Sequence, residues 1–114
     1  MIRTNVNYEM DNEMYNEIVT VKNIIIRNFD DVEVYLYGSV AKGCYSSESD
    51  IDLLILYKGN EELHRLRMEI NRLIPLNGRE IQCVFYKKDS FIESLKEVSF
   101  ASSILQDLVD VKEW

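Results

Sequence analysis

A short and almost continuous apolar run, Ile-Asp-Leu-Leu-Ile-Leu-Tyr at residues 51–57, constrains the fold of this chain more than any other feature. Its aliphatic content is typical of a strand in the interior of a sheet rather than at an edge. Residues 33–37 are rich in β-branched and aromatic side chains and stop at Gly38, so they predict a second strand. We therefore expect a β-sheet in which residues 51–57 are central.

Residues 8–29 predict a long amphipathic helix. Apolar residues recur there at every third or fourth position, at Met10, Met14, Ile18, Val21, Ile25 and Phe29. Glu9, Asp11 and Glu13 are expected in its first turns, where the positive end of the helix dipole favours a carboxylate.

The remaining segments predict one more helix, a third strand and two helical segments. We expect Asn60 to cap a helix that ends near Pro75, residues 77–78 to form a turn and residues 79–86 to form the strand. The last two helical segments are centred on Phe91, Ile92 and Leu95, and on Ala101, Ile104, Leu105 and Leu108. This order predicts an α+β fold, with a mixed central sheet of three or more strands flanked by helices.

The composition is that of a globular chain of 114 residues, which we expect to form one domain over residues 1–114. Thirteen basic and 20 acidic residues give a net charge of −7, which argues against a broad nucleic-acid-binding face. No apolar run of about 18 residues is present to span a membrane, and residues 1–5 do not resemble a signal peptide. Cys44, Cys83 and His64 are too few for a disulfide framework or a zinc cluster. We therefore expect a cytoplasmic protein.

The connection between the first two strands carries the residues best suited to chemistry. Gly38 and Ser39 follow a strand directly, which suggests a tight turn into a short helix. A glycine lets the backbone approach a ligand closely, and the free N–H groups at the start of a helix attract phosphate. Ser39 adds a hydroxyl donor. Many hairpins and helix caps also contain Gly-Ser, so this pair alone is weak evidence for phosphate binding.

Asp50 and Asp52 strengthen that interpretation. At positions i and i+2 of a strand, their side chains project from the same face, at the start of a strand that is otherwise apolar. Two adjacent carboxylates repel one another unless a cation lies between them, and Mg²⁺ binds through one or two carboxylates together with substrate phosphates. Taken alone, Asp-x-Asp is more often a solvated strand start, with Asp50 capping a turn.

Ten residues, 40–49, separate Ser39 from Asp50, so the full pattern is G-S-x(10)-D-x-D between two strands. This pattern resembles the nucleotidyltransferase superfamily of the DNA polymerase beta fold. It is most similar to the minimal nucleotidyltransferases, which are small stand-alone domains. The resemblance is specific over residues 34–56 and continues more weakly to residues 98–105, which are similar to the family's closing helix.

The resemblance implies a Mg²⁺-dependent transfer of a nucleoside monophosphate, AMP from ATP. Gly38 and Ser39 would bind the β- and γ-phosphates, and the catalytic carboxylates Asp50 and Asp52 would hold two Mg²⁺ ions while an acceptor hydroxyl attacks the α-phosphorus. Lys42 stands where the family often has arginine. It would keep the positive charge for nucleotide binding but lose the bidentate geometry, and a solvated loop lysine is an equal alternative.

The sequence departs from the family at the third metal-binding carboxylate. In the run Ile-Gln-Cys-Val at residues 81–84, Gln82 stands where the family usually has aspartate. Its neutral carbonyl oxygen is a poorer ligand for a hard dication than a carboxylate. Glu80 lies on the same face of that strand by alternation, and its longer side chain is the alternative third ligand.

Two functions therefore remain open. Stand-alone minimal nucleotidyltransferases are often paired with a HEPN-domain protein as the antitoxin of a toxin–antitoxin system, and they can transfer AMP to a toxin tyrosine. The small size of the chain favours such a protein acceptor. The alternative is a weak or inactive module that binds and neutralises or scaffolds a partner, which Gln82 favours. Modification of a small molecule would need a second subunit, and a homo-oligomer is left open.

Overall fold

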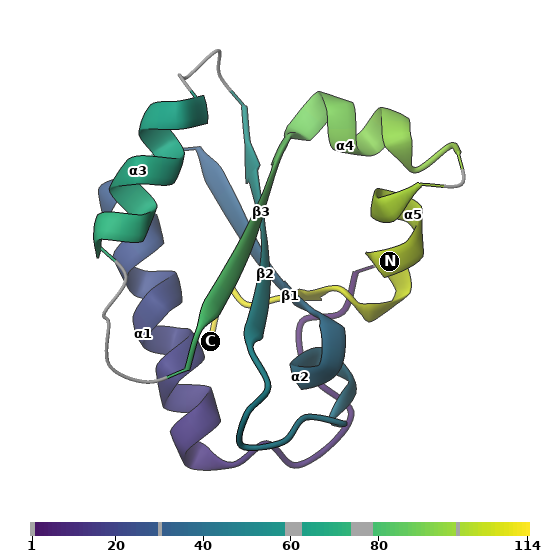
Figure 1. Ribbon diagram of the computed structural model, residues 1–114. Coiled ribbons are helices and arrows are strands. Elements are labelled where there is room, and N and C mark those ends of the chain that lie inside the picture. Colours follow the sequence, from purple (N-terminus) through teal and green to yellow (C-terminus); the bar gives the residue numbers. More distant parts are fainter. Residues whose placement is uncertain (1, 30, 59–62, 74–78, 98) are drawn as a thin grey trace.

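The computed structural model describes residues 2–29, 31–58, 63–73, 79–97 and 99–114. Within these ranges, four strands form one mixed sheet in the order β3-β2-β1-β4 (Figure 1). The interior strand β2 is antiparallel to β1 and parallel to β3, while β4 is antiparallel to β1. The strands are β1 (Val32–Tyr37), β2 (Ile51–Tyr57), β3 (Ile81–Lys87) and β4 (Val109–Asp110). The prediction of an α+β fold with β2 inside the sheet is confirmed.

Helices cover both faces of this sheet (Figure 1). One face is covered by α1 and α3, the other by α4 and α5, and α2 follows β1 directly at one end of the sheet. The helices are α1 (Asn12–Asn28), α2 (Gly38–Lys42), α3 (Leu63–Leu73), α4 (Lys88–Ser94), α5 (Phe100–Ile104) and the 3-10 helix η1 (Leu105–Asp107). None of the helices found in the described ranges is long and apolar enough to cross a membrane.

Two apolar clusters hold these layers together. The cluster under α1 and α3 includes Met14, Ile18, Leu36, Leu53 and Ile70. The cluster under α4 and α5 includes Tyr37, Leu54, Phe91, Ala101 and Ile104. Leu53 and Leu54 point to opposite faces of β2 and are both fully buried. This two-sided burial is the physical reason for the continuous apolar run, because each face of β2 packs against its own layer.

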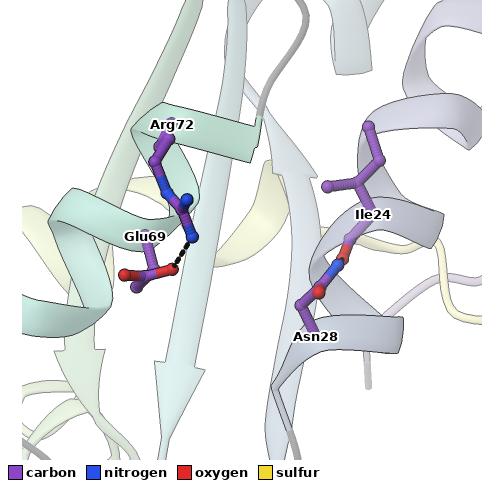
Figure 2. Close-up of polar contacts among 4 residues, drawn as sticks. All are labelled: Ile24, Asn28, Glu69 and Arg72. Atoms are coloured by element: carbon purple, nitrogen blue, oxygen red, sulfur yellow. Dashed lines mark hydrogen bonds and ion pairs between the residues drawn. The ribbon is translucent and has the colours of Figure 1, made fainter.

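The helices α1 and α3 lie side by side, and their last turns carry local side-chain contacts (Figure 2). On α1, Asn28 Nδ2 donates a hydrogen bond to the carbonyl oxygen of Ile24 at 2.7 Å. On α3, Arg72 Nη2 lies 2.6 Å from Glu69 Oε2 in an exposed ion pair. The Asn28 side chain thus binds a carbonyl group of the last turn of α1, and Arg72 forms a local surface pair on α3.

The long first helix begins later than its periodicity predicts. Asp11 is its N-cap, since the Asp11 carboxylate accepts a hydrogen bond from the backbone N–H of Met14 at 2.8 Å. Glu9 and Asp11 therefore precede the helix, and only Glu13 lies in its first turn. The expectation that Glu9, Asp11 and Glu13 all lie within the first turns was wrong. A capping aspartate has an extended backbone, so the helix begins only after it.

The end of the chain also differs from the prediction. The expected helix around Leu108 stops at Asp107, and Val109–Asp110 form the edge strand β4 beside β1. Local periodicity does not show a two-residue strand, because its pairing with Leu36 and Tyr35, and the bridge of Val109 to Arg3, define it. The expected cap at Asn60, the end near Pro75 and the turn at residues 77–78 lie outside the described residues.

Candidate active site

The turn between β1 and α2 brings backbone close to the second aspartate of the Asp-x-Asp motif. Gly38 begins α2 with φ +77°, a left-handed conformation that favours glycine. A Cβ atom added there would lie 3.2 Å from Cγ of Asp52 and closer still to its carboxylate oxygen. Gly38 is therefore required both by its backbone conformation and by the approach of Asp52. Ser39 follows it, half-buried, in the first turn of α2.

The two aspartates lie at the same end of the sheet as this turn. Asp50 directly precedes β2, and Asp52 is the second residue of β2, opposite Tyr37 in the antiparallel register. Burial, followed by the negative charge of Asp50, raises the pKa of Asp52 above its ordinary value of 3.8. The predicted repulsion between the carboxylates is thus present, and the structure brings Gly38, Asp50 and Asp52 together.

The parallel pairing of β2 with β3 decides which residue stands beside Asp52. Its register partner is Gln82. The Gln82 amide nitrogen Nε2 donates a hydrogen bond to Glu80 Oε1 at 3.0 Å, and the Glu80 carbonyl oxygen accepts one from the Ile51 N–H at 3.0 Å. Glu80 and Gln82 therefore share one face of this strand end, as alternation predicts. Among the described residues, no three His, Cys, Asp or Glu side chains gather closely enough to hold a metal ion.

Lys42, one of the sequence candidates for nucleotide binding, has a protein partner. Its Nζ atom lies 3.8 Å from Oδ2 of Asp107 in η1, and about half of the Lys42 side chain is exposed. The ion pair joins the last turn of α2 to the segment after α5. Sequence reasoning left Lys42 between a nucleotide ligand and a solvated lysine, and it did not identify Asp107, which is far away in the sequence.

Aromatic residues that the motif does not contain border the site. The Tyr37 ring lies edge-on to the Phe100 ring at 5.9 Å, and Phe100 is 44% exposed. Burial, together with the nearby charge of Asp52, raises the pKa of Tyr37 to about 12. The only sequence signal for this aromatic pair was the position of Phe100 in the segment that resembles the family's closing helix.

The comparisons with known proteins agree with this fold. The family model for a nucleotidyltransferase domain matches residues 18–111. The chain belongs to the nucleotidyltransferase domain family. A crystal structure of a protein from Sulfolobus solfataricus, itself proposed to be a nucleotidyltransferase, shares the fold with a TM-score of 0.55 and 24% identity, covering 91% of this chain and 89% of that one. No curated protein gives a significant match to the chain.

Nucleotidyltransferases usually act on a nucleoside triphosphate with a divalent metal ion, and the described residues offer such an ion a pair of carboxylates rather than a group of three ligands. Asp50 and Asp52 offer hard carboxylate oxygens, and within the described ranges no lysine or arginine forms an ion pair with Asp52. Burial and the neighbouring charge of Asp50 raise the pKa of Asp52, so both disfavour its ionised form. A bound cation would favour the ionised form.

Proposed function

We propose that this protein is a Mg²⁺-dependent nucleotidyltransferase that transfers AMP from ATP to a hydroxyl group on a partner protein. The observation that carries the proposal is the close approach of Gly38 to Asp52, which supports phosphate binding by this turn beside the carboxylate pair. Family membership supports nucleotidyl transfer in general. The family does not specify ATP, Mg²⁺ or a protein acceptor, and these three choices are part of our proposal.

In this mechanism the chain mainly positions charged groups. Gly38 and Ser39 would bind the β- and γ-phosphates through backbone N–H groups and the Ser39 hydroxyl. Asp50 and Asp52 would hold Mg²⁺, which when bound neutralises charge on the attacking and leaving oxygens. The acceptor hydroxyl attacks the α-phosphorus in line, its proton passes to water, and pyrophosphate leaves. Lys42 is paired with Asp107, so phosphate binding by Lys42 would compete with that ion pair.

The proposed partner is a HEPN-domain toxin, with this protein as its antitoxin. The resemblance to the minimal nucleotidyltransferases supports this choice, since members of that group act on such partners. The net charge of −7 also suits association with a basic protein surface.

A second function is favoured by one observation. Gln82 is the register partner of Asp52, where a carboxylate would complete a metal site. A neutral amide there weakens binding of a hard dication. In this alternative the chain keeps the fold and neutralises its partner by binding alone, with little or no transfer.

Intact-mass measurement separates the two functions. The protein is incubated with Mg²⁺, one nucleoside triphosphate at a time, and the protein encoded by the adjacent gene. We expect the partner to gain the mass of AMP, and Asp50→Ala to abolish the gain. Asp89→Ala is the matched control, because Asp89 is an exposed aspartate on α4 outside the site. A partner that stays bound with unchanged mass would support the binding module instead.

A further inference from the structure

The arginine just before β3 contacts the loop that delivers Asp50 to the site. This loop, residues 43–50, connects α2 to β2 and ends at Asp50. Arg79 is distant from it in sequence, and its side chain is half-buried against it. The contacts of Arg79 were not evident from any sequence motif.

A single guanidinium nitrogen of Arg79 bridges two carbonyl groups of the loop. Nη1 donates to the carbonyl oxygen of Ser46 at 2.7 Å and to that of Ser49 at 2.8 Å. Ser49 is the residue directly before Asp50. The guanidinium also lies over the Tyr45 ring, 5.6 Å from its centroid. Arg79 therefore contacts the loop at three of its residues.

The bridged segment is itself a closed turn. The Ser49 N–H donates to the Ser46 carbonyl oxygen at 3.2 Å, and the Ser46 N–H donates to Ser49 Oγ at 2.9 Å. Because both carbonyls bound by Arg79 belong to this turn, the guanidinium holds it as one unit. The Ile51 N–H then pairs with the Glu80 carbonyl, so β2 joins β3 immediately after Asp50.

Both partners of this contact are fixed to α1. The backbone N–H of Arg79 donates to Glu17 Oε1 at 2.5 Å. The Tyr45 hydroxyl donates to Oδ2 of Asp11 at 2.6 Å, while Oδ1 of the same carboxylate caps α1. The loop and the start of β3 are thus both hydrogen-bonded to side chains at the beginning of α1. These contacts restrict the movement of one segment relative to the other.

We propose that Arg79 is a positioning residue for the metal site: by binding Ser46 and Ser49 it holds Asp50 beside Asp52. The inference rests on the proposed function. Two like charges held close together repel, so a loop free to move would separate the carboxylates. The bridging contact opposes that separation before any cation binds. A lysine has no planar guanidinium and would not reproduce both hydrogen bonds and the stacking on Tyr45.

The test compares Arg79→Gln and Arg79→Lys with Arg72→Gln, which removes an exposed arginine of α3 that pairs with Glu69 on the same helix. Mn²⁺ is titrated in the presence of ATP and followed by electron paramagnetic resonance, at a temperature where circular dichroism shows each variant folded. We expect Arg79→Gln to weaken Mn²⁺ binding about 10- to 100-fold, as for other residues that orient a ligand. Arg79→Lys should fall in between, and Arg72→Gln should match the wild type.

The outcomes distinguish this inference from the proposed function. Wild-type protein that binds no Mn²⁺ with ATP would overturn the proposed function and this inference with it. Wild-type binding together with unchanged affinity in folded Arg79→Gln would overturn the inference alone. If Arg79→Gln does not fold, Arg79→Lys decides, because it keeps the charge: wild-type affinity in that variant contradicts the positioning role, and reduced affinity supports it.

Discussion

Two half-buried carboxylates, Glu33 and Asp52, lie on the same face of the β1–β2 pair, at opposite ends. They differ in their partners and in the direction of their pKa shifts. Glu33, near the start of β1, accepts a hydrogen bond from the Tyr35 hydroxyl at 2.6 Å and lies 2.7 Å from Lys88 Nζ. Although burial opposes ionisation, these contacts hold the pKa of Glu33 below its usual range. Asp52, at the other end, has Asp50 as its charged neighbour, and its pKa is raised by burial and by that charge.

The charged residues around Glu33 and Asp52 differ as well. A cavity of about 400 Å³ next to Glu33 is lined by charges of both signs, from Asp31, Glu33, Lys58, Lys88, Asp110 and Lys112. At the other end, the nearby Lys42 is paired with Asp107. Lys88 neutralises the charge of Glu33, whereas none of the described lysines and arginines forms an ion pair with Asp52. The first carboxylate is structural, and we propose that the second binds a cation.

The largest expected effect is that of Asp52→Asn. Removing a metal ligand should lower the transfer rate by about 10³-fold or more, since a metal ion contributes several kcal/mol to the transition state. The same variant should unfold at a higher temperature than the metal-free wild type, because it removes a repelled carboxylate. Calorimetry together with the mass assay measures both, and a lower unfolding temperature would contradict the comparison.

The pH dependence of the metal-free protein follows from the same group. A carboxyl whose folded pKa is raised binds more protons in the folded state than in the unfolded state. Its contribution to stability is therefore lost as pH rises from its unfolded value of 3.8 through the folded pKa. Urea unfolding across this window should show a steeper loss in the wild type than in Asp52→Asn.

Gly38→Ala should have the next largest effect. The left-handed backbone alone should cost about 1–3 kcal/mol for a residue with a side chain, and the new methyl group would also displace Asp52. Gly43→Ala is the matched control. Gly43 also has a left-handed backbone, with φ +84°, but its added Cβ would meet the Tyr8 ring instead of Asp52. Both variants should lose stability, and Gly38→Ala should lose more Mn²⁺ affinity. Equal affinities would contradict the role of Gly38 at the site.

Gln82→Asp should sharpen the difference between the two ends. A third carboxylate beside Asp52 should tighten Mg²⁺ binding about tenfold, since affinity rises with the number of charged ligands. It should also destabilise the metal-free protein by adding repulsion. Thermal unfolding with and without Mg²⁺ measures both changes. A variant that is destabilised equally in both conditions would show that residue 82 does not face the cation.

Glu33→Gln should have the smallest effect and leave transfer unchanged. Because the folded pKa of Glu33 is lowered, its ion pair stabilises the protein above the unfolded pKa of 4.5 and is lost as pH falls through the folded value. The variant should therefore unfold slightly more easily than the wild type at pH 7, and the difference should vanish in acid. Urea titrations at several pH values test this, and a change in the transfer rate would argue against a purely structural role.

Much of the fold was predictable because its signals are local. The bounds of β2 at residues 51–57 follow from burial on both faces, which requires an unbroken apolar run. The motif around Gly38 and Asp52 was also visible, because the glycine, the serine and both aspartates lie within 15 residues, from 38 to 52. The start of α1 was missed since capping depends on the conformation of one residue, Asp11.

By itself, then, the sequence determined the α+β class, the interior strand and the G-S-x(10)-D-x-D motif, each of which depends on residue types that are neighbours in the chain. The tertiary structure decided what surrounds that motif. It placed Gln82 beside Asp52 through the parallel register, Asp107 beside Lys42, and Arg79 against the loop before Asp50. These pairs join segments that are distant in sequence, and only the packing of the whole chain brings them within reach of one another.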